Sequence, residues 1–534
     1  MSADVPPRAT VEPGEEGWPG TGPDPAAATT AGSLFRAGAW NTTSRMIPQL
    51  YVLVISIAAA RFLGAEEFGR QSFIAFVGLS LALFLSGGLS ITATRFLGDL
   101  LGRGDRAGVA RLARWVWQVE AVAAILGGSI LALAAAAGAE PEAAWVLLAI
   151  GVTLGILHAA PTALLIGAQR WRAASLVGLV TGAGSTVAII VVLDAGGGIA
   201  GMFAVEAVAA AVSLAWIGLL AHRAMAEVAP LRGRERLSVP AWRTLRRALW
   251  RYAIPTTYGL LLTIVVWRRS EFFFLEHYSS DTEIALYSIA FAVVSALVQL
   301  PDVIGAITLP AVATLSGAGQ AERIQRGFSR ALRLVFLVSL PVTAVSFALG
   351  PTLLIVVFGE EFRDTRAVFL IMLAPFPLLP LLSLSRSVLA GLGRLRVPLM
   401  IETGAAVLNI GLAFLLVPGQ GAVGAAIANV AAQATAAVLV LGYSLVEVGP
   451  VAWRPFALWR AALAALAAGL AGWAIVLLAS DVVALVAGAA VAAAVFAALA
   501  FALRILPRED AIWLDDHAGD RLWGLVGAFC RRCA

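Results

Sequence analysis

Gly391-Leu-Gly-Arg-Leu-Arg396 and Gly419-Gln-Gly-Ala-Val-Gly424 stand at the two ends of an apolar run. Both motifs have an earlier counterpart, in Gly167-Ala-Gln-Arg-Trp-Arg172 and Gly196-Gly-Gly-Ile-Ala-Gly201, and the counterparts also enclose an apolar run. The two pairs of motifs are spaced by 224 and 223 residues. Matching glycine and arginine positions at both ends of an apolar segment indicate an internal duplication.

The composition indicates an integral membrane protein. Of the 534 residues, 60% are hydrophobic and only 13% are charged. All 38 basic residues are arginines, so the chain has no Walker A lysine, no Schiff-base lysine and no Ser-x-x-Lys nucleophile. We therefore expect that the protein does not hydrolyse ATP and is not an enzyme. The net charge of +5 comes from arginines between apolar runs, which favours a role in membrane topology over a nucleic-acid partner.

The apolar runs predict about fourteen transmembrane helices. A helix needs about 20 apolar residues to cross a bilayer. The runs that meet this length are 38–60, 72–94, 115–137, 144–166, 174–193, 199–221, 252–274, 285–312, 331–357, 367–390, 397–417, 422–444, 456–479 and 482–503. Residues 1–33 have no apolar core, so we expect a disordered cytoplasmic tail there and no signal peptide.

The arginines predict the orientation of the spans. If the N-terminus is cytoplasmic, 30 of the 38 arginines fall on the cytoplasmic side. The predicted outer loops contain only Arg61, Arg70, Arg268, Arg269, Arg363 and Arg366. Positive charge accumulates on the cytoplasmic side of membrane proteins, so both termini are predicted to be inside.

The duplication then predicts two lobes of equal orientation. Its copies fall on the fifth and sixth and on the eleventh and twelfth spans, which are an even number of spans apart, so the repeats are parallel. The expected organisation is all-α, with two pseudo-symmetric six-helix lobes and an extra C-terminal helix pair. The predicted boundaries are an N-lobe at 34–221, an Arg-rich cytoplasmic linker at 222–251, a C-lobe at 252–445, the extra pair at 446–503 and a cytoplasmic tail at 504–534.

Several motifs give the chain a family resemblance. Ala60-Arg-Phe-Leu-Gly-Ala-Glu-Glu-Phe-Gly69 follows the first span, and Gly88-Leu-Ser-Ile-Thr-Ala-Thr-Arg95 closes the second. The other motifs are Tyr252-Ala-Ile-Pro255, Leu286-Tyr-Ser-Ile-Ala290, Phe358-Gly-Glu-Glu-Phe362 and Asn409 followed by residues 418–428. In their order and spacing the chain resembles the polysaccharide and lipid-linked oligosaccharide exporters of the multidrug/oligosaccharidyl-lipid/polysaccharide (MOP) superfamily.

This resemblance implies a function and its partners. It implies two lobes around a central cavity that opens to either side of the bacterial cytoplasmic membrane. The cargo would be an isoprenoid-diphosphate-linked glycan whose head crosses in the cavity while its lipid stays among the membrane lipids. Glycosyltransferases and a glycan polymerase of the same pathway are the expected protein partners. The extra helix pair could form a groove for the lipid tail.

An anionic, hydroxyl-rich cargo requires positive charge and hydrogen-bonding groups within the membrane. Arg45 is the first candidate, since it lies 16 residues before Arg61, about 24 Å along a helix. The pair Ser44-Arg45 also resembles the first-helix serine and arginine of lipid II flippases. The further cationic candidates are Arg95, Arg268, Arg269 and Arg386. For each arginine, a side chain that reaches back to the headgroups is the open alternative.

Carboxylates within spans are candidates for binding a coupling proton or sodium ion. They are Glu120, Glu206, Asp302 and Glu402, and pairing with an arginine between helices is the alternative for each. Glu402 and Asn409 are seven residues apart, so they share a helix face that we expect to look at the cavity.

Two further polar candidates, Asn429 and Gln433, would bind sugar hydroxyls or join helices. His158 is interpreted as a packing residue or a proton relay. No cofactor or metal is expected, because Cys530 and Cys533 form a lone Cys-x-x-Cys in the tail.

The leading hypothesis is therefore a flippase for a lipid-linked glycan precursor. A multidrug or cation antiporter of the same superfamily is the alternative, but the first span has Arg45 and no carboxylate. A membrane glycan polymerase or ligase is a third possibility, which the short predicted outer loops disfavour.

Overall fold

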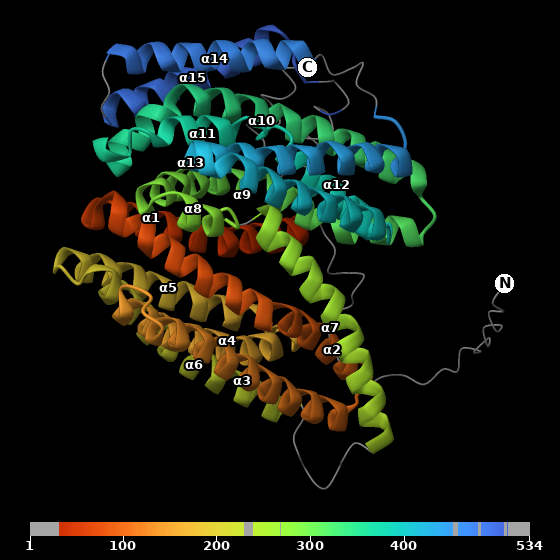
Figure 1. Ribbon diagram of the computed structural model, residues 1–534. Helices are drawn as coiled ribbons and strands as arrows, with labels where there is room; N and C mark the ends of the chain where they lie inside the picture. Colours follow the sequence, from red (N-terminus) through yellow and green to blue (C-terminus); the bar gives the residue numbers. More distant parts are fainter. Residues whose placement is uncertain are drawn as a thin grey trace.

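The computed structural model describes residues 31–228, 239–267, 269–451, 458–478, 482–506 and 510. For residues 31–46, 228, 299–307 and 310 it describes the backbone only. Within these ranges the secondary structure is helical and no strand occurs (Figure 1).

The N-lobe begins with one long helical run, α1 (Ala31–Ala82), which contains the first predicted span and the start of the second. The run bends at Gly64, whose φ of 77° suits a residue without Cβ. A π-helical turn, η1 (Leu83–Gly87), connects α1 to α2 (Gly88–Gly102). The other helices of this lobe are α3 (Arg106–Ala136), α4 (Glu142–Gly167), α5 (Trp171–Asp194) and α6 (Gly198–Val228).

The C-lobe has the same kind of long, bent helix near its end. This helix, α13 (Arg396–Val448), contains the eleventh and twelfth predicted spans and bends at Gly421, where φ is 52°. The tenth predicted span is divided by the Pro375 and Pro377 region into α11 (Thr365–Leu373) and α12 (Leu379–Gly391). The remaining elements are α7 (Val239–Trp267), α8 (Phe272–Tyr278), α9 (Asp281–Gly317), α10 (Ala321–Phe358) and the 3-10 turn η2 (Glu360–Phe362).

The structure confirms a polytopic all-α membrane fold. In the described residues, eleven helices are long and apolar enough to cross a membrane. Two of them contain a pair of predicted spans each, and the tenth predicted span is divided between two shorter helices. The number of fourteen crossings and the cytoplasmic position of both termini stay predictions.

Within the predicted linker at 222–251, the described residues 222–228 and 239–251 are helical. Helix α6 runs to Val228 and α7 begins at Val239. Trp242, Leu245 and Leu249 of α7 pack into an apolar cluster with α2, α3 and α4. Arginines alternate with these apolar residues in the sequence, so the apolar face of the helix is not evident from the composition of the segment.

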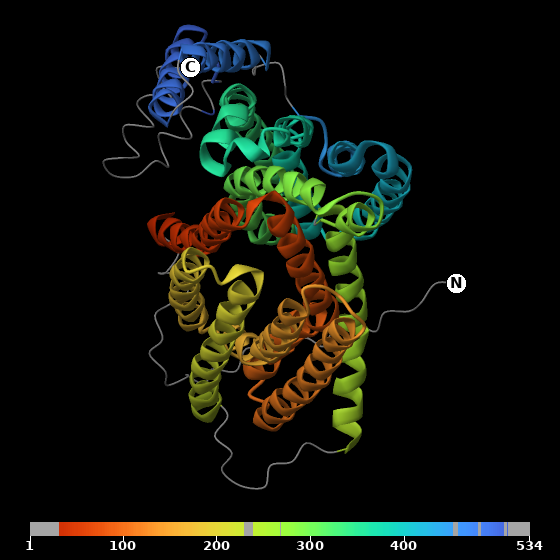
Figure 2. The same ribbon diagram turned by 60° about the vertical axis from the view of Figure 1, so that its left-hand side comes forward.

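The helices form two groups that meet along α1 and α7 (Figures 1 and 2). Helix α1 packs against α9, and α2 packs against α7. The second contact is close, because a Cβ atom built on Gly88 would lie 2.0 Å from the Thr257 hydroxyl. Contact between the lobes therefore depends on small residues at the crossing points.

The extra pair, α14 (Leu458–Leu478) and α15 (Val482–Ala502), packs on α10 beside the C-lobe (Figure 1). A Cβ atom on Gly472 would lie 3.0 Å from the Gly488 carbonyl oxygen, and one on Gly469 would lie 2.9 Å from the Ala344 carbonyl oxygen. Glycines thus allow close helix contact both within the pair and between the pair and α10.

The described residues that follow α15, at the start of the predicted cytoplasmic tail, pack against α10. Ile505 and Leu506 are buried against residues of α10 and α15. Asp510 is fully buried, and its carboxylate accepts hydrogen bonds from Arg330 and Arg333 at 2.8–2.9 Å. Asp510 therefore attaches this segment to α10.

We predict that Asp510→Ala destabilises the C-lobe. Removal of one partner from a buried ion pair leaves the other charge uncompensated, which costs about 3 kcal/mol. Thermal unfolding of the detergent-solubilised protein should show a lower midpoint. Asp99→Ala is the control, because Asp99 pairs with Arg103 in an exposed i,i+4 pair that contributes about 0.5 kcal/mol or less. Equal midpoints for the two variants would contradict the structural role of Asp510.

Candidate functional site

A cavity of about 570 Å³ lies between the two lobes. Residues of α1 and α6 form its N-lobe wall, and residues of α7, α9, α11, α12 and α13 form most of its C-lobe wall. The polar residues that decide its chemistry are Gln71, Glu206, Arg269, Arg386, Asn429 and Gln433. All of them except Gln71 are candidates predicted from the sequence. The fold therefore brings together candidates that are up to 227 residues apart in the sequence, from Glu206 to Gln433.

Both arginines of the cavity are on the C-lobe wall and contact aromatic rings. The Arg386 guanidinium lies 4.5 Å from the centroid of the Trp267 ring, and its Nη2 pairs with Glu402 at 2.7 Å. The Arg269 guanidinium lies 5.0 Å from the centroid of the Phe291 ring. Stacking on an aromatic face holds a guanidinium in place. The N–H groups lie in the plane of the guanidinium, so stacking does not use them.

The opposite wall provides one carboxylate, Glu206 of α6, and the amide of Gln71. The cavity lining therefore has two guanidinium groups and one carboxylate within the described residues. The polar side chains divide by charge, with both cations on the C-lobe wall and the anion on the N-lobe wall.

A carboxylate with no exposed surface, Glu271, lies behind the C-lobe wall at the junction of α7 and α8. Its Oε1 accepts hydrogen bonds from the side-chain amides of Asn409 at 2.7 Å and Asn429 at 2.8 Å. Its Oε2 accepts one from the Tyr287 hydroxyl at 2.9 Å. Gln433 donates to Asn429 at 2.7 Å. Since Asn429 and Gln433 line the cavity, a chain of hydrogen bonds connects the cavity to Glu271.

Glu271 is not among the sequence-predicted candidates. A signal was present, since Glu271 precedes Phe272, Phe273 and Phe274. Three consecutive phenylalanines indicate a buried segment, and a glutamate next to a buried segment requires hydrogen-bond partners.

The expectation that Glu402 and Asn409 share a cavity-facing surface is not met. Glu402 pairs with Arg386 of α12, and the amide of Asn409, which is 1% exposed, points to Glu271. Neither residue lines the central cavity. The reason is that this face of α13 packs against α12 and the α7–α8 junction.

The other N-lobe candidates lie away from the central cavity. Arg95 stacks on Tyr252, with the guanidinium 4.2 Å from the ring centroid. Glu120 is buried and accepts a hydrogen bond from Ser90. His158 contacts the hydroxyls of Ser213 and Thr162, as a packing histidine does.

Some candidates cannot be placed. The side chains of Arg45 and Asp302 and the residues Arg268, Cys530 and Cys533 lie outside the described part of the chain. Among the described residues, no group of three or more His, Cys, Asp or Glu side chains could hold a metal ion.

The lobes are joined at the end where the predicted outer loops lie. Arg61 of α1 donates hydrogen bonds to the carbonyl oxygens of Val356 and Val357, at the C-terminus of α10. Glu361 accepts a hydrogen bond from the backbone N–H of Ala65 at 3.0 Å. We call the contacts of Arg61 and Glu361 across the lobes the outer lock. A guanidinium at a helix C-terminus also interacts favourably with the helix dipole.

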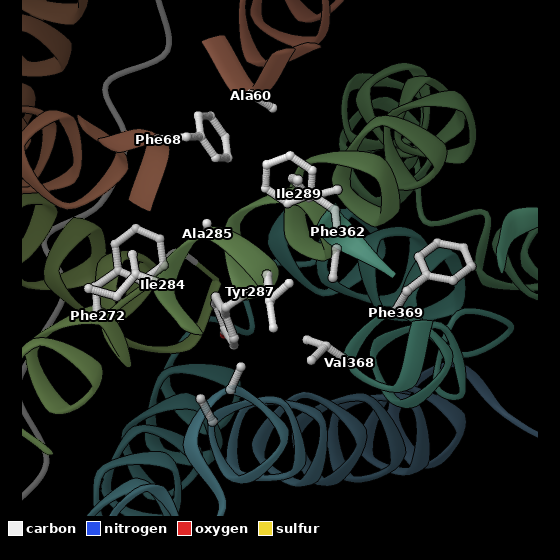
Figure 3. Close-up of a cluster of buried hydrophobic side chains, with 14 of the residues drawn as sticks. Ala60, Phe68, Phe272, Ile284, Ala285, Tyr287, Ile289, Phe362, Val368 and Phe369 are labelled. Atoms are coloured by element: carbon white, nitrogen blue, oxygen red, sulfur yellow. The ribbon is translucent and has the colours of Figure 1, made fainter. Parts of the chain in front are cut away.

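Aromatic side chains fill the space beneath the outer lock. Phe68 of α1 meets Phe362 edge-to-face at 6.3 Å, and both are buried (Figure 3). Phe76 of α1 meets Phe272 and Phe273 at 5.3 Å each. The cavity is therefore closed by packed side chains toward the predicted outer side.

Two families have sequence models that match the chain. A model described as "Polysaccharide biosynthesis protein" matches residues 34–316, which is more than half of the chain. The chain belongs to that family. Within this polysaccharide biosynthesis family member, residues 261–415 also match the MatE family. A comparison with curated proteins found no match.

Solved structures share the fold of this family member at low sequence identity. An inward-facing multidrug resistance MATE transporter of the MOP superfamily has a TM-score of 0.62 and 16% identity, over 75% of this chain and 94% of that chain. The lipid II flippase MurJ in an inward closed conformation has a TM-score of 0.62 and 12% identity, over 88% and 98%. A MOP transporter from Pyrococcus furiosus has a TM-score of 0.54 and 16% identity, over 76% and 94%. The chain thus has the two-lobe fold of MOP superfamily transporters.

We predict that loss of the outer lock opens the cavity to the outside. In a chain with Cys530 and Cys533 replaced by serine, a cysteine at Ser56 reports on the cavity, because Ser56 lines it. The double variant Arg61→Ala/Glu361→Ala should make this cysteine react several-fold faster with a membrane-impermeant maleimide added from outside.

The matched control for this prediction is Arg363→Ala. Arg363 is at the same end of the molecule, but it pairs with Glu360 in its own lobe. The control should keep the parental labelling rate. An unchanged rate in the double variant would show that the outer lock does not hold the cavity shut.

Proposed function

We propose that this transporter moves a lipid-linked glycan, an isoprenoid-diphosphate oligosaccharide or polysaccharide precursor, across the bacterial cytoplasmic membrane by alternating access. The observation that carries this proposal is that Arg269 and Arg386 both line one wall of the central cavity. Membership of the polysaccharide biosynthesis family supports it as well.

A diphosphate suits this wall of the cavity. Guanidinium groups bind phosphate oxygens through paired, charge-assisted hydrogen bonds. The amides of Asn429 and Gln433 are part of the same wall and suit sugar hydroxyls. Glu402 compensates the charge of Arg386, and an arriving phosphate would compete with this carboxylate. Arg386 therefore has a counter-charge before the cargo binds, which limits the cost of its burial.

A multidrug or cation antiporter is the second candidate function. Glu206 favours it, because a carboxylate on the cavity wall would attract a cationic drug. The two arginines oppose it, since like charges in a confined site of low dielectric repel strongly. We therefore place the anionic cargo first.

We propose further that Glu271 is the site of ion coupling, with a proton as the coupling ion. The carboxylate is fully buried, and its hydrogen-bond donors come from α9 and from both halves of α13. Protonation would change these hydrogen bonds, and the change would reach the cavity through Asn429 and Gln433. The glycosyltransferases that build the cargo and the polymerase that extends it remain the proposed protein partners.

We predict that Arg269→Gln and Arg386→Gln each reduce glycan export at least about tenfold, since each removes a charged hydrogen-bond donor worth about 1.5–3 kcal/mol. A strain that lacks the gene should accumulate lipid-linked glycan in the inner leaflet, and the wild-type gene should reverse the accumulation. The double variant Arg386→Gln/Glu402→Gln separates loss of the arginine from the effect of an uncompensated Glu402.

The control for export is Arg394→Gln. Arg394 pairs with Glu447 outside the cavity, and its side chain is 61% exposed. It should restore export like the wild type. Full export by Arg269→Gln/Arg386→Gln, or drug efflux without any glycan accumulation in the deletion strain, would refute the proposed function.

We predict that Glu271→Gln removes the response of transport to a pH gradient. Glutamine keeps the shape of the side chain but cannot take up a proton. Proteoliposomes with a labelled cargo analogue should show gradient-dependent flipping for the wild type and gradient-independent flipping for the variant. Glu66→Gln is the control, because the Glu66 side chain is 75% exposed. A variant that still responds to the gradient would exclude Glu271 as the coupling site.

A further inference from the structure

A second cavity, of about 600 Å³, lies within the N-lobe and shares no lining residue with the central cavity. Residues of α2 and α4 and the first residue of α5, Trp171, line it. The other faces of α4 are covered by α3 and α6, and α2 is covered by α3 and α7. Four of the residues that line it, Ile91, Arg95, Gly155 and Trp171, are exposed, so this cavity is open at the surface of the lobe.

Among the described residues that line this cavity, Arg95 is the only arginine, aspartate or glutamate. Its guanidinium stacks on the Tyr252 ring at 4.2 Å, which holds it in place. No carboxylate in the described part of the chain forms an ion pair with it. Two arginines at the same end of the lobe differ from it, because Arg103 pairs with Asp99 and Arg170 pairs with Glu227. Stacking leaves the guanidinium N–H groups of Arg95 able to bind an anion.

An aromatic ring and hydroxyl groups complete the lining. Trp171 is 52% exposed and presents a large flat surface. Thr162 and Ser90 contribute hydroxyls that contact His158 and Glu120, respectively. Hydroxyl groups have both donor and acceptor capacity, so each can make a further hydrogen bond.

We propose that this cavity is a subsite for an acidic sugar, that is, a sugar ring with a carboxylate or phosphate group. The anion would bind Arg95, the apolar face of the ring would lie on Trp171, and its hydroxyls would meet Thr162 and Ser90. A sugar matches the combination of one cation, one aromatic surface and several hydroxyls, because an acidic sugar ring has an anion for the first, an apolar face for the second and hydroxyl groups for the third. The proposal rests on the proposed function and narrows the cargo to glycans with acidic units.

The first test compares two disaccharides that differ in one group. Cellobiouronate and cellobiose are titrated against the full-length protein in nanodiscs by calorimetry or saturation-transfer NMR. The wild type should bind the acidic disaccharide at least tenfold more tightly. Arg95→Gln should abolish this preference and leave cellobiose binding unchanged. Arg103→Gln is the control and should behave as the wild type, because Arg103 pairs with Asp99 outside the cavity.

The second test fills the cavity without changing any charge. A Cβ atom on Gly155, which lines the cavity, would meet no atom within 4 Å. Gly155→Leu should therefore fold normally, with an unchanged thermal midpoint, and weaken binding of both disaccharides at least tenfold. Gly178→Leu is the control, because Gly178 is exposed and has open space around its Cβ position as Gly155 does, but it does not line the cavity.

Three outcomes would overturn the inference. They are equal binding of both disaccharides by the wild type, retained binding in Gly155→Leu, and Arg95-dependent binding of pyrophosphate that excludes cellobiouronate. The last result would assign the anion to the lipid carrier instead of the sugar. Failure of the proposed function can be distinguished from failure of this inference. If the proposed function is wrong, the deletion strain does not accumulate lipid-linked glycan, whatever this cavity binds.

Discussion

The buried carboxylate of Glu271 must have its hydrogen bonds satisfied within the protein, and the C-lobe is arranged around this requirement. A charge in a medium of low dielectric is costly unless donors surround it. Tyr287, Asn409 and Asn429 supply those donors from three places in the sequence. They hold α9 and both halves of α13 against the α7–α8 junction. The same packing places Arg269 on Phe291 and Gln433 on the cavity wall.

The two lobes are repeats in sequence but differ in chemistry. The C-lobe provides both arginines and the paired amides of the central cavity, while the N-lobe provides Glu206. The N-lobe has its own cation, Arg95, in a separate cavity. Duplicated helices thus retain the fold through glycines and apolar faces, while their polar residues change independently.

The sequence predicted the class of fold and many of the cavity residues, but not their orientation. The apolar length of a span depends on the membrane alone, so it predicted the all-α, membrane-spanning class of fold. The rotation of a helix about its axis depends on the helices that pack against it. The spacing of Glu402 and Asn409 therefore places both on one face of α13, but it does not show that α12 and the α7–α8 junction cover this face. Gly64 and Gly421 separate the predicted spans within α1 and α13, because the backbone leaves the helical conformation at both residues.

The attachment of α14 and α15 also bears on how the protein sits in the lipid. The pair packs on α10, and the chain beyond it is fixed to α10 by Asp510. The C-lobe and the pair therefore form one body with a larger perimeter of lipid than the N-lobe. In a viscous bilayer the body with the larger perimeter is displaced less. When the lobes separate at the outer lock, we therefore expect the N-lobe to swing while the C-lobe, with Arg269 and Arg386, stays nearly still relative to the surrounding lipid.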